Sequence, residues 1–428
     1  MKILLINQPA SNRGDEAAHR GLMRALCARY PDAKLTVVFL GVDPESVRAM
    51  QVQRPNIDYV LIPLRRSEAC RIPVYASMLH LRALVTHLHP AYRRLRQLMC
   101  QADYIVNAPG GICMGGFQNW GHVFHLEMAR GCRKPVAYYS RSFGPFRERS
   151  RRERLFKRLS LDLLRSFDFL AIRDSKTMAL ADQLGLRYVA AIDAAFLDVP
   201  TASIPSEVDT AIGSGAYTVF VPNSLVWHVD YRSADPQRID QFYLAILDRL
   251  CVTGGSEKVV MLPQLYNVGR HGDFHYFEKL KALSAHRDRI VVLPETYGSD
   301  VQQSIIAKAK FMVGARYHSI VFALNNRVPF VSLSYEHKMP GLLAILGQNG
   351  RGVDIRSLGQ AGFDEAACLR KIEIGLEQSQ LPDTVTDHAH ALAQECFQAL
   401  CRRIDSFDSF EPVGRSKKVA SPVPGTMP

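Results

Sequence analysis

Long apolar runs are missing from this sequence of 428 residues. No stretch approaches the roughly 18 consecutive apolar residues that a membrane-spanning helix needs, and the apolar run at residues 3–6 is too short for the core of a signal peptide. We therefore expect a protein that stays in the cytosol. The nine cysteines include no C-x-x-C pair, so the sequence predicts reduced thiols, with neither a disulfide framework nor a zinc site.

Signatures of nucleic-acid binding are also missing. There is no helix-turn-helix pattern, no aromatic RNP strand and no zinc-finger spacing, so nucleic acid is not an expected partner. Positive charge, in contrast, is abundant: the formal net charge is +12, which favours small anions or anionic lipid headgroups. The densest basic segment, residues 147–158, fits either a solvated helix face or a contact with a phosphate-rich surface.

The composition, 47% apolar and 22% charged, excludes a mainly disordered chain, and the length exceeds what one hydrophobic core usually organises. We therefore expect two domains. We place an N-terminal domain at residues 1–198, a Pro- and Ser-bearing linker at 199–216, a C-terminal domain at 217–410 and a disordered tail at 411–428.

Short β-branched runs alternate with longer amphipathic segments along both predicted domains. The first set of runs lies at residues 2–7, 34–40, 57–62, 104–107, 135–139 and 169–172. The second set lies at residues 218–222, 258–262, 289–293, 311–313 and 329–333, before one long predicted helix over 364–404. Apolar runs joined by crossovers are typical of parallel sheets covered by helices. The sequence predicts an α/β protein with two Rossmann-like domains facing a cleft.

Ligands of open parallel sheets bind beyond the carboxyl ends of the strands, so the loops there are candidate sites. The loop after the first strand contains Asn12, Gly14 and Asp15, which fit either a plain turn and cap or a helix N-terminus whose amides face the cleft. The loop after residues 104–107 contains Gly110 and Gly111, and no Gly-Lys-Ser/Thr follows as in a Walker A loop. It fits a phosphate or sugar contact or a mobile loop.

Cations follow three other strands. Arg173 ends a predicted strand, where it would bind a carboxylate or phosphate of a ligand or pair with a neighbouring acid. Arg316 and His318 lie between a buried strand and an apolar helix, which places a fixed cation and a group that titrates near neutral pH at a helix N-terminus. Lys338 follows the next strand, close enough in the fold to share an anion with Arg316.

These motifs, in this order, resemble the polysaccharide pyruvyl transferase family. The resemblance covers about residues 1 to 350, and its most specific elements are R-x-H-S at 316–319 and S-Y-x-x-K at 334–338. The earlier elements are N-R-G-D at 12–15, P-G-G at 109–111, R-D at 173–174 and M-L-P-Q at 261–264. Where the family often has Asp-Pro, this chain has Asp193-Ala194, so the role of Asp193 is open.

The resemblance implies a GT-B-like fold and transfer of the carbons of phosphoenolpyruvate to a sugar as a pyruvate ketal. It implies that Arg316 holds an anionic group of the donor, and we add Arg173 and Lys338 as further donor ligands. We assign His318 as the acid that protonates the enol carbon and Asp15 as a base. No metal or cofactor is expected beyond phosphoenolpyruvate as co-substrate.

On this interpretation Asn12, Gly14, Gly110 and Gly111 line the acceptor side. The acceptor would be a sugar of a bacterial surface or exported polysaccharide, or a lipid-linked precursor at the inner membrane face. Residues 147–158 would then hold the enzyme near anionic lipid. Two alternatives fit the same pattern: a GT-B nucleotide-sugar glycosyltransferase, and a non-catalytic protein that binds carbohydrates or anions. The acceptor sugar, the ketal stereochemistry and the oligomeric state do not follow from the sequence.

Overall fold

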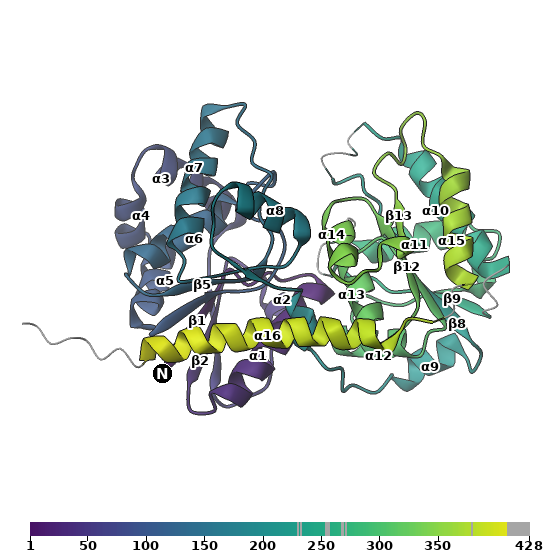
Figure 1. The fold of residues 1–428 in the computed structure, drawn as a ribbon, viewed down its shortest axis with the longest axis horizontal. Coiled ribbons are helices and arrows are strands. Elements are labelled where there is room, and N and C mark those ends of the chain that lie inside the picture. Colours follow the sequence, from purple (N-terminus) through teal and green to yellow (C-terminus); the bar gives the residue numbers. More distant parts are fainter. Residues whose placement is uncertain are drawn as a thin grey trace, which may run out of the picture.

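A computed structural model describes residues 1–228, 231, 233–252, 257–266, 269, 272–377 and 380–408. The segment 411–428, for which the sequence predicts disorder, lies outside the described residues. Two parallel sheets, each covered by helices, lie side by side in Figure 1. The predicted α/β class with two Rossmann-like units is confirmed. None of the described helices is long and apolar enough to cross a membrane.

The first sheet has seven parallel strands in the order β3-β2-β1-β4-β5-β6-β7. The strands are β1 (Lys2–Ile6), β2 (Lys34–Leu40), β3 (Ile57–Ile62), β4 (Tyr104–Asn107), β5 (Val136–Arg141), β6 (Phe169–Ile172) and β7 (Val189–Ala190). The helices are α1 (Arg13–Arg29), α2 (Pro44–Ala49), α3 (Arg66–Met78), α4 (Arg82–Leu88), α5 (Pro90–Gln101), α6 (Trp120–Gly131), α7 (Arg151–Ser166) and α8 (Ser175–Gln183). In β1, Ile3 and Leu5 enter one apolar core and Leu4 and Ile6 the other, so both faces are buried.

The second sheet has six parallel strands in the order β10-β9-β8-β11-β12-β13. The strands are β8 (Tyr217–Val221), β9 (Lys258–Met261), β10 (Ile290–Val292), β11 (Phe311–Gly314), β12 (Phe330–Ser334) and β13 (Gly352–Asp354). The helices are α9 (Ser206–Ile212), α10 (Pro236–Val252), α11 (Asp273–Leu283), α12 (Ser299–Ala307), α13 (Tyr317–Asn325), α14 (Lys338–Ile345), α15 (Glu365–Glu377) and α16 (Asp383–Asp408). Helix α9 lies within the segment predicted as a linker.

Both sheets reverse their strand order beside the first strand of the sheet, at β1/β4 and at β8/β11. Such a switch point opens a crevice at the carboxyl ends of the two strands, and ligands of this architecture bind there. The loops after β1, β4, β8 and β11 are therefore the loops to compare with the predicted site.

The single helix predicted over residues 364–404 is wrong, because two helices, α15 and α16, occupy this stretch. Pro382 directly precedes α16; a proline has no N–H to donate and restricts the residue before it, so it starts a helix better than it continues one. Helix α16 crosses from the second sheet to the first (Figure 1). Near its end, Arg403 donates to Asp168 at 2.5 Å, and the Tyr30 hydroxyl donates to the carbonyl of Cys401 at 3.2 Å. The predicted domain limits stay a prediction.

Candidate active site

The two halves meet at the loop that follows β1. The N–H of Arg13 donates to the carbonyl of Gln264 at 2.9 Å, and the N–H of Tyr266 donates to the carbonyl of Ser11 at 3.2 Å. The side chain of Asn12 caps α1 by accepting from the N–H of Gly14 at 2.8 Å. The first turn of α1 thereby faces the second half of the molecule.

Gly14 and His318 are in direct contact across this interface. A Cβ atom on Gly14 would lie 1.7 Å from Cγ of His318, so only glycine leaves room for the imidazole. His318 lies in the first turn of α13, and only 8% of its surface is exposed. Two of the predicted site residues, one from each half of the molecule, are thus in contact. Asp15, the predicted base, follows Gly14 on α1 and is half-buried.

His318 also lies next to a buried ion pair between Arg173 and Asp193. The Nε2 atom of His318 is 3.6 Å from Oδ2 of Asp193. Burial alone would raise the pKa of Asp193, but the charge of Arg173, the contact with His318 and the N–H of Ala195 hold that pKa well below its usual range. The sequence allowed two interpretations of Arg173: binding of a ligand, or pairing with a neighbouring acid. In the structure Arg173 pairs with Asp193, which therefore lies in the candidate site.

Arg316 pairs with Asp273, a residue that the sequence analysis missed. The other oxygen of Asp273 accepts from the backbone N–H groups of Gln264 and Leu265, at 3.0 and 3.1 Å, so this carboxylate is held from two sides. The guanidinium of Arg316 also lies 5.8 Å from the centre of the Trp227 ring, whose surface is 53% exposed. Trp227 therefore stands beside the predicted donor cation.

Lys338 pairs with Glu336 at 2.8 Å and lies 5.8 Å from the centre of the Tyr317 ring. The guanidinium of Arg173 lies 4.9 Å from the same ring, so Tyr317 links the two cations. Burial would raise the pKa of Glu336, but Lys338 lowers it below its usual value. Each of the three predicted donor cations is therefore paired with a carboxylate.

Several buried polar atoms of this region have no hydrogen-bond partner among the described residues. They are Nε of Arg173, Nε of Arg316, Nε2 of His318, Nε2 of Gln264, Nδ2 of Asn223, and the hydroxyls of Tyr266 and Tyr317. Buried polar groups in proteins are normally paired, because an unpaired one costs about 1–3 kcal/mol. Most of these atoms are donors, which is the hydrogen-bonding chemistry that an anionic ligand requires.

The glycine-rich loop is shaped by Arg141, which sequence analysis did not select. Arg141 is fully buried and donates to the carbonyls of Ala108 and Gly111, at 2.8 and 3.3 Å. A Cβ on Gly110 would lie 2.8 Å from Cγ of Pro9, so this loop adjoins the loop after β1, and the predicted acceptor residues share one rim. Arg141 ends a strand, as Arg173 nearly does, and the strand-end rule could have found it.

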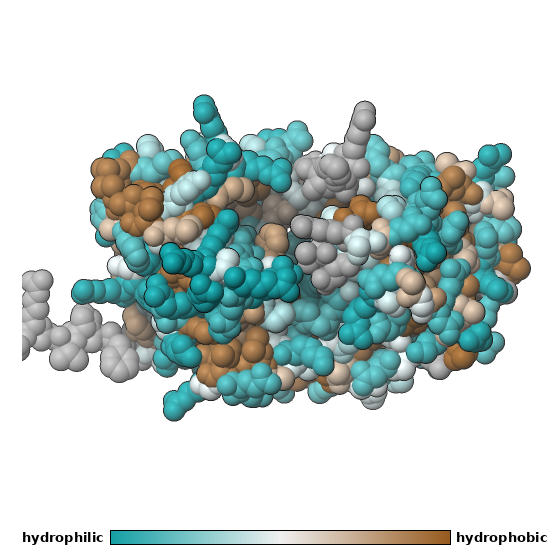
Figure 2. All heavy atoms as spheres, turned by 90° about the horizontal axis from the view of Figure 1, so that it is seen from above, coloured by the Kyte–Doolittle hydropathy of each residue, from teal (hydrophilic) through white to brown (hydrophobic). Residues whose placement is uncertain are grey.

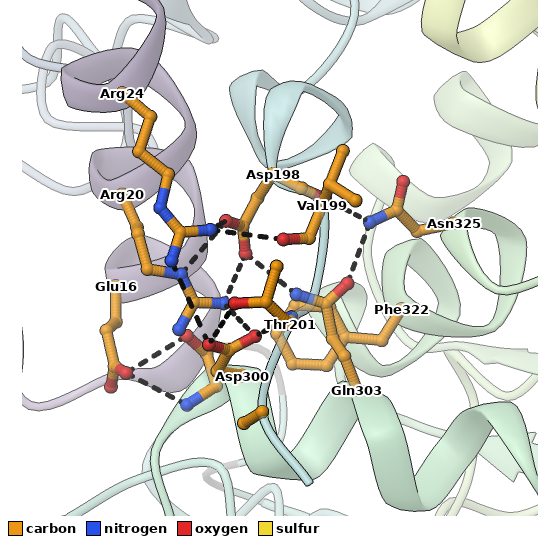
Figure 3. Close-up of polar contacts among 12 residues, drawn as sticks. Glu16, Arg20, Arg24, Asp198, Val199, Thr201, Asp300, Gln303, Phe322 and Asn325 are labelled. Carbon is orange, nitrogen blue, oxygen red and sulfur yellow. Dashed lines mark hydrogen bonds and ion pairs between the residues drawn. The ribbon is translucent and has the colours of Figure 1, made fainter. Parts of the chain in front are cut away.

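A second buried charge cluster, the linker network, joins α1 to the second half at the start of the linker (Figure 3). Arg20 donates to both oxygens of Asp198, at 2.9 and 2.5 Å, and Gln303 of α12 donates to the same carboxylate at 2.9 Å. Asn325 of α13 donates to the carbonyl of Asp198 at 2.8 Å. On α1, one turn before Arg20, Glu16 accepts from the N–H and the hydroxyl of Ser299. The network fixes the orientation of α1, and with it the position of Gly14 against His318.

The basic segment at residues 147–158 spans the start of α7, which Ser150 caps. Lys157 pairs with Glu148, and Arg152 lies 5.5 Å from the centre of the Trp120 ring. These local contacts fit the solvated helix face that the sequence left open. No group of three or more His, Cys, Asp or Glu side chains in the described part of the chain could hold a metal ion. That the reaction needs no metal stays a prediction.

The fold defines the class of protein. The UDP-GlcNAc 2-epimerase of Methanocaldococcus jannaschii superposes with a TM-score of 0.57 at 11% identity, over 94% of this chain and 99% of that chain. An α,α-trehalose 6-phosphate synthase of Burkholderia multivorans superposes with a TM-score of 0.52 at 13% identity, over 96% and 99%. At these identities the likeness establishes the fold alone, and the fold is GT-B-like.

Within that class the sequence specifies a family. The model of the polysaccharide pyruvyl transferase family matches residues 12–337, a range that contains Gly14, Arg173, Arg316 and His318. The chain belongs to the polysaccharide pyruvyl transferase family. It is also 22% identical over 386 residues to the amylovoran biosynthesis protein AmsJ of Erwinia amylovora, over 84% of this chain and 89% of that protein.

Proposed function

We propose that the protein transfers the pyruvyl group of phosphoenolpyruvate to two hydroxyls of one sugar residue, forming a ketal. The sugar belongs to a polysaccharide or to its precursor. The observation that carries this proposal is the meeting of Arg316 and His318, at the start of α13, with Gly14 at the start of α1. Two helix N-termini, buried donors and a histidine lie together there, which suits a small anion that must be protonated.

The residues divide the chemistry as follows. His318 protonates C3 of the enol, which makes C2 electrophilic, and a sugar hydroxyl adds to C2. Inorganic phosphate leaves and the second hydroxyl closes the ketal. Of the two hydroxyl protons, one replaces the proton that His318 gave to C3 and the other leaves with phosphate. Arg316 holds the phosphate or the carboxylate of the donor, and Lys338 adds positive charge.

Asp193 and Arg173 act behind His318. Asp193 lies 3.6 Å from Nε2 of the imidazole and is itself held by Arg173 and by the N–H of Ala195. A carboxylate in this position orients the ring and returns it to the same place after each proton transfer. The acceptor binds on the rim formed by the loops of Gly14 and Gly111, where Asp15 is the proposed base.

The test is calorimetric titration of phosphoenolpyruvate into the wild-type protein and into Arg316→Ala. We expect binding in the wild type and a loss of at least about tenfold in affinity in the variant, the size of one charge-assisted contact. Arg356→Ala is the matched control, because it removes an exposed arginine paired with Asp354 on the same half. Heat with a UDP-sugar and none with phosphoenolpyruvate would replace the proposal with the glycosyltransferase interpretation.

Fluorescence gives an independent readout of the same site. The chain has two tryptophans, of which Trp120 is buried and Trp227 lies beside Arg316. In Trp120→Phe, emission comes from Trp227 alone. We expect phosphoenolpyruvate to change this emission and Arg316→Ala to remove the change. An unchanged emission, together with calorimetric binding, would place the donor elsewhere.

A further inference from the structure

Helices α3 and α4 expose large apolar side chains. Six large apolar side chains on and between these helices are 42–67% exposed, and we call them the α3–α4 surface: Tyr75, Met78, Leu79, Leu81, Leu84 and Leu88. They are six of the fifteen exposed large apolar residues of the described chain, gathered within fourteen positions. Single exposed apolar residues are ordinary, whereas a contiguous patch marks a binding surface.

The spacing of the exposed leucines shows that they share one face of a helix. Leu81, Leu84 and Leu88 recur at intervals of three and four, which places them on one face of α4. The buried residues of the two helices are Pro73, Val74, Ala76, Ser77 and Thr86, none of which is as large as the exposed leucines. A helix that packs only against its own domain does the opposite. Figure 2 shows hydrophobic residues gathered at the end of the molecule where Figure 1 places α3 and α4, on the side away from the second half.

Charge indicates what covers this surface. Residues 59–102 contain seven arginines and one acidic residue, Glu68. Five of these arginines are exposed: Arg65, Arg66, Arg71, Arg93 and Arg94. Among the described residues, Arg82 of this stretch forms an ion pair with Glu127, whereas the five exposed arginines form none, so their charge is available. Apolar side chains bordered by arginines match a layer whose interior is apolar and whose surface is anionic.

We propose that the α3–α4 surface docks on an anionic lipid bilayer. The leucines and Tyr75 enter the boundary between headgroups and acyl chains, and the arginines contact lipid phosphates. A second copy of the chain is the weaker occupant, because a two-fold contact would face arginines with arginines. Docking here leaves the loops around Gly14 and His318 uncovered, since they lie between the halves. The inference does not depend on the proposed reaction.

The test is flotation of the full chain with vesicles of phosphatidylglycerol and phosphatidylcholine in equal parts, and with vesicles of phosphatidylcholine alone. We expect flotation with the first vesicles, and a loss of about tenfold or more in Leu84→Glu/Leu88→Glu, because two charges would enter the apolar boundary. The matched control is Val252→Glu/Leu283→Glu, which places the same charges at exposed apolar positions of the second half. All four positions are exposed, so thermal unfolding should stay unchanged.

Two further variants separate this surface from the basic segment on α7. We expect Arg65→Glu/Arg66→Glu to weaken flotation and Arg151→Glu/Arg158→Glu to leave it unchanged. The opposite pattern, or full flotation of Leu84→Glu/Leu88→Glu, would overturn the proposal. Light scattering covers the remaining case: a wild-type dimer that Leu84→Glu/Leu88→Glu dissociates would assign the surface to self-association and also overturn it.

Discussion

The linker network and the site around His318 are both buried charge clusters built on an arginine–aspartate pair, yet they differ in how their polar atoms are paired. In the linker network, the carboxylate and the carbonyl of Asp198 accept from Arg20, Gln303 and Asn325. Around His318, in contrast, the Nε atoms of Arg173 and Arg316 and the Nε2 atom of the imidazole have no hydrogen-bond partner among the described residues, although Nε2 lies 3.6 Å from Asp193. A saturated cluster stabilises the fold, whereas an unsaturated one leaves donors that a ligand can use.

We expect the largest loss of unfolding free energy from a substitution in the linker network. Arg20→Ala leaves the buried carboxylate of Asp198 without its main partner, and breaking such a pair costs about 3 kcal/mol or more of unfolding free energy. Urea unfolding followed by circular dichroism measures this loss. Arg356→Ala, which breaks an exposed pair, should cost about 1 kcal/mol or less. Equal losses in the two variants would contradict the view that burial and saturation make the network structural.

A substitution at the site around His318 should instead lower activity and leave stability nearly unchanged. His318→Asn removes the proposed acid, so we expect kcat to fall by about a hundredfold or more while the unfolding free energy changes by about 1 kcal/mol or less. Steady-state release of phosphate from phosphoenolpyruvate, with an acceptor present, measures kcat. Wild-type turnover in this variant would remove His318 from the acid role.

Gly14→Ala places a smaller change at the contact between the halves. The new Cβ would collide with the imidazole of His318, so the ring must move, and we expect about a tenfold loss of activity. The same collision with a buried ring should cost about 1–3 kcal/mol of unfolding free energy, offset in part by the about 1 kcal/mol by which alanine favours a helix over glycine. Wild-type activity in a variant that is destabilised by this amount would mean that Gly14 serves packing rather than the position of His318.

A separate prediction concerns His19, which directly precedes Arg20 on α1. His19 is fully buried against the first sheet, and burial lowers its pKa from 6.5 to about 3. Below about pH 6.5, His19 binds a proton in the unfolded chain but not in the folded chain. The unfolding free energy therefore falls as the pH falls from 6.5 toward 3. The slope is about 1.4 kcal/mol per pH unit.

His19→Gln tests this slope. A glutamine can keep contacts with Gln8 and Tyr59, which bond the imidazole at 3.1 Å each, but it does not titrate. Unfolding measured between pH 6.5 and 5 should depend less steeply on pH in the variant. The same slope in both proteins would assign the acid sensitivity to other groups, such as His125, whose pKa burial lowers to about 4.

Strands were predictable from the sequence because their signal is local. The apolar run of β2, residues Lys34–Leu40, and that of β6, Phe169–Ile172, are found at the predicted bounds. The two short edge strands β7 and β13 were missed, since two or three residues carry no periodicity. The break between α15 and α16 was missed although Pro382 marks it.

Site residues that directly follow a strand could be predicted from the sequence, as Arg173 and Arg316 were. Their carboxylate partners were not, because Asp193 and Asp273 are 20 and 43 residues away and only the fold brings them close. The contact of Gly14 with His318 depends on how the two halves face each other, and no local pattern reports that. The roles of these residues stay predictions.

Helix α16 has a consequence for how the protein is made. A ribosome delivers the strands of the first sheet early, but the helix turn that bonds Tyr30 and Asp168 is among the last described residues to emerge. The first half therefore keeps one flank uncovered until residue 403 has been translated. Premature termination before residue 401 would remove both contacts and leave the already translated first half without this cover.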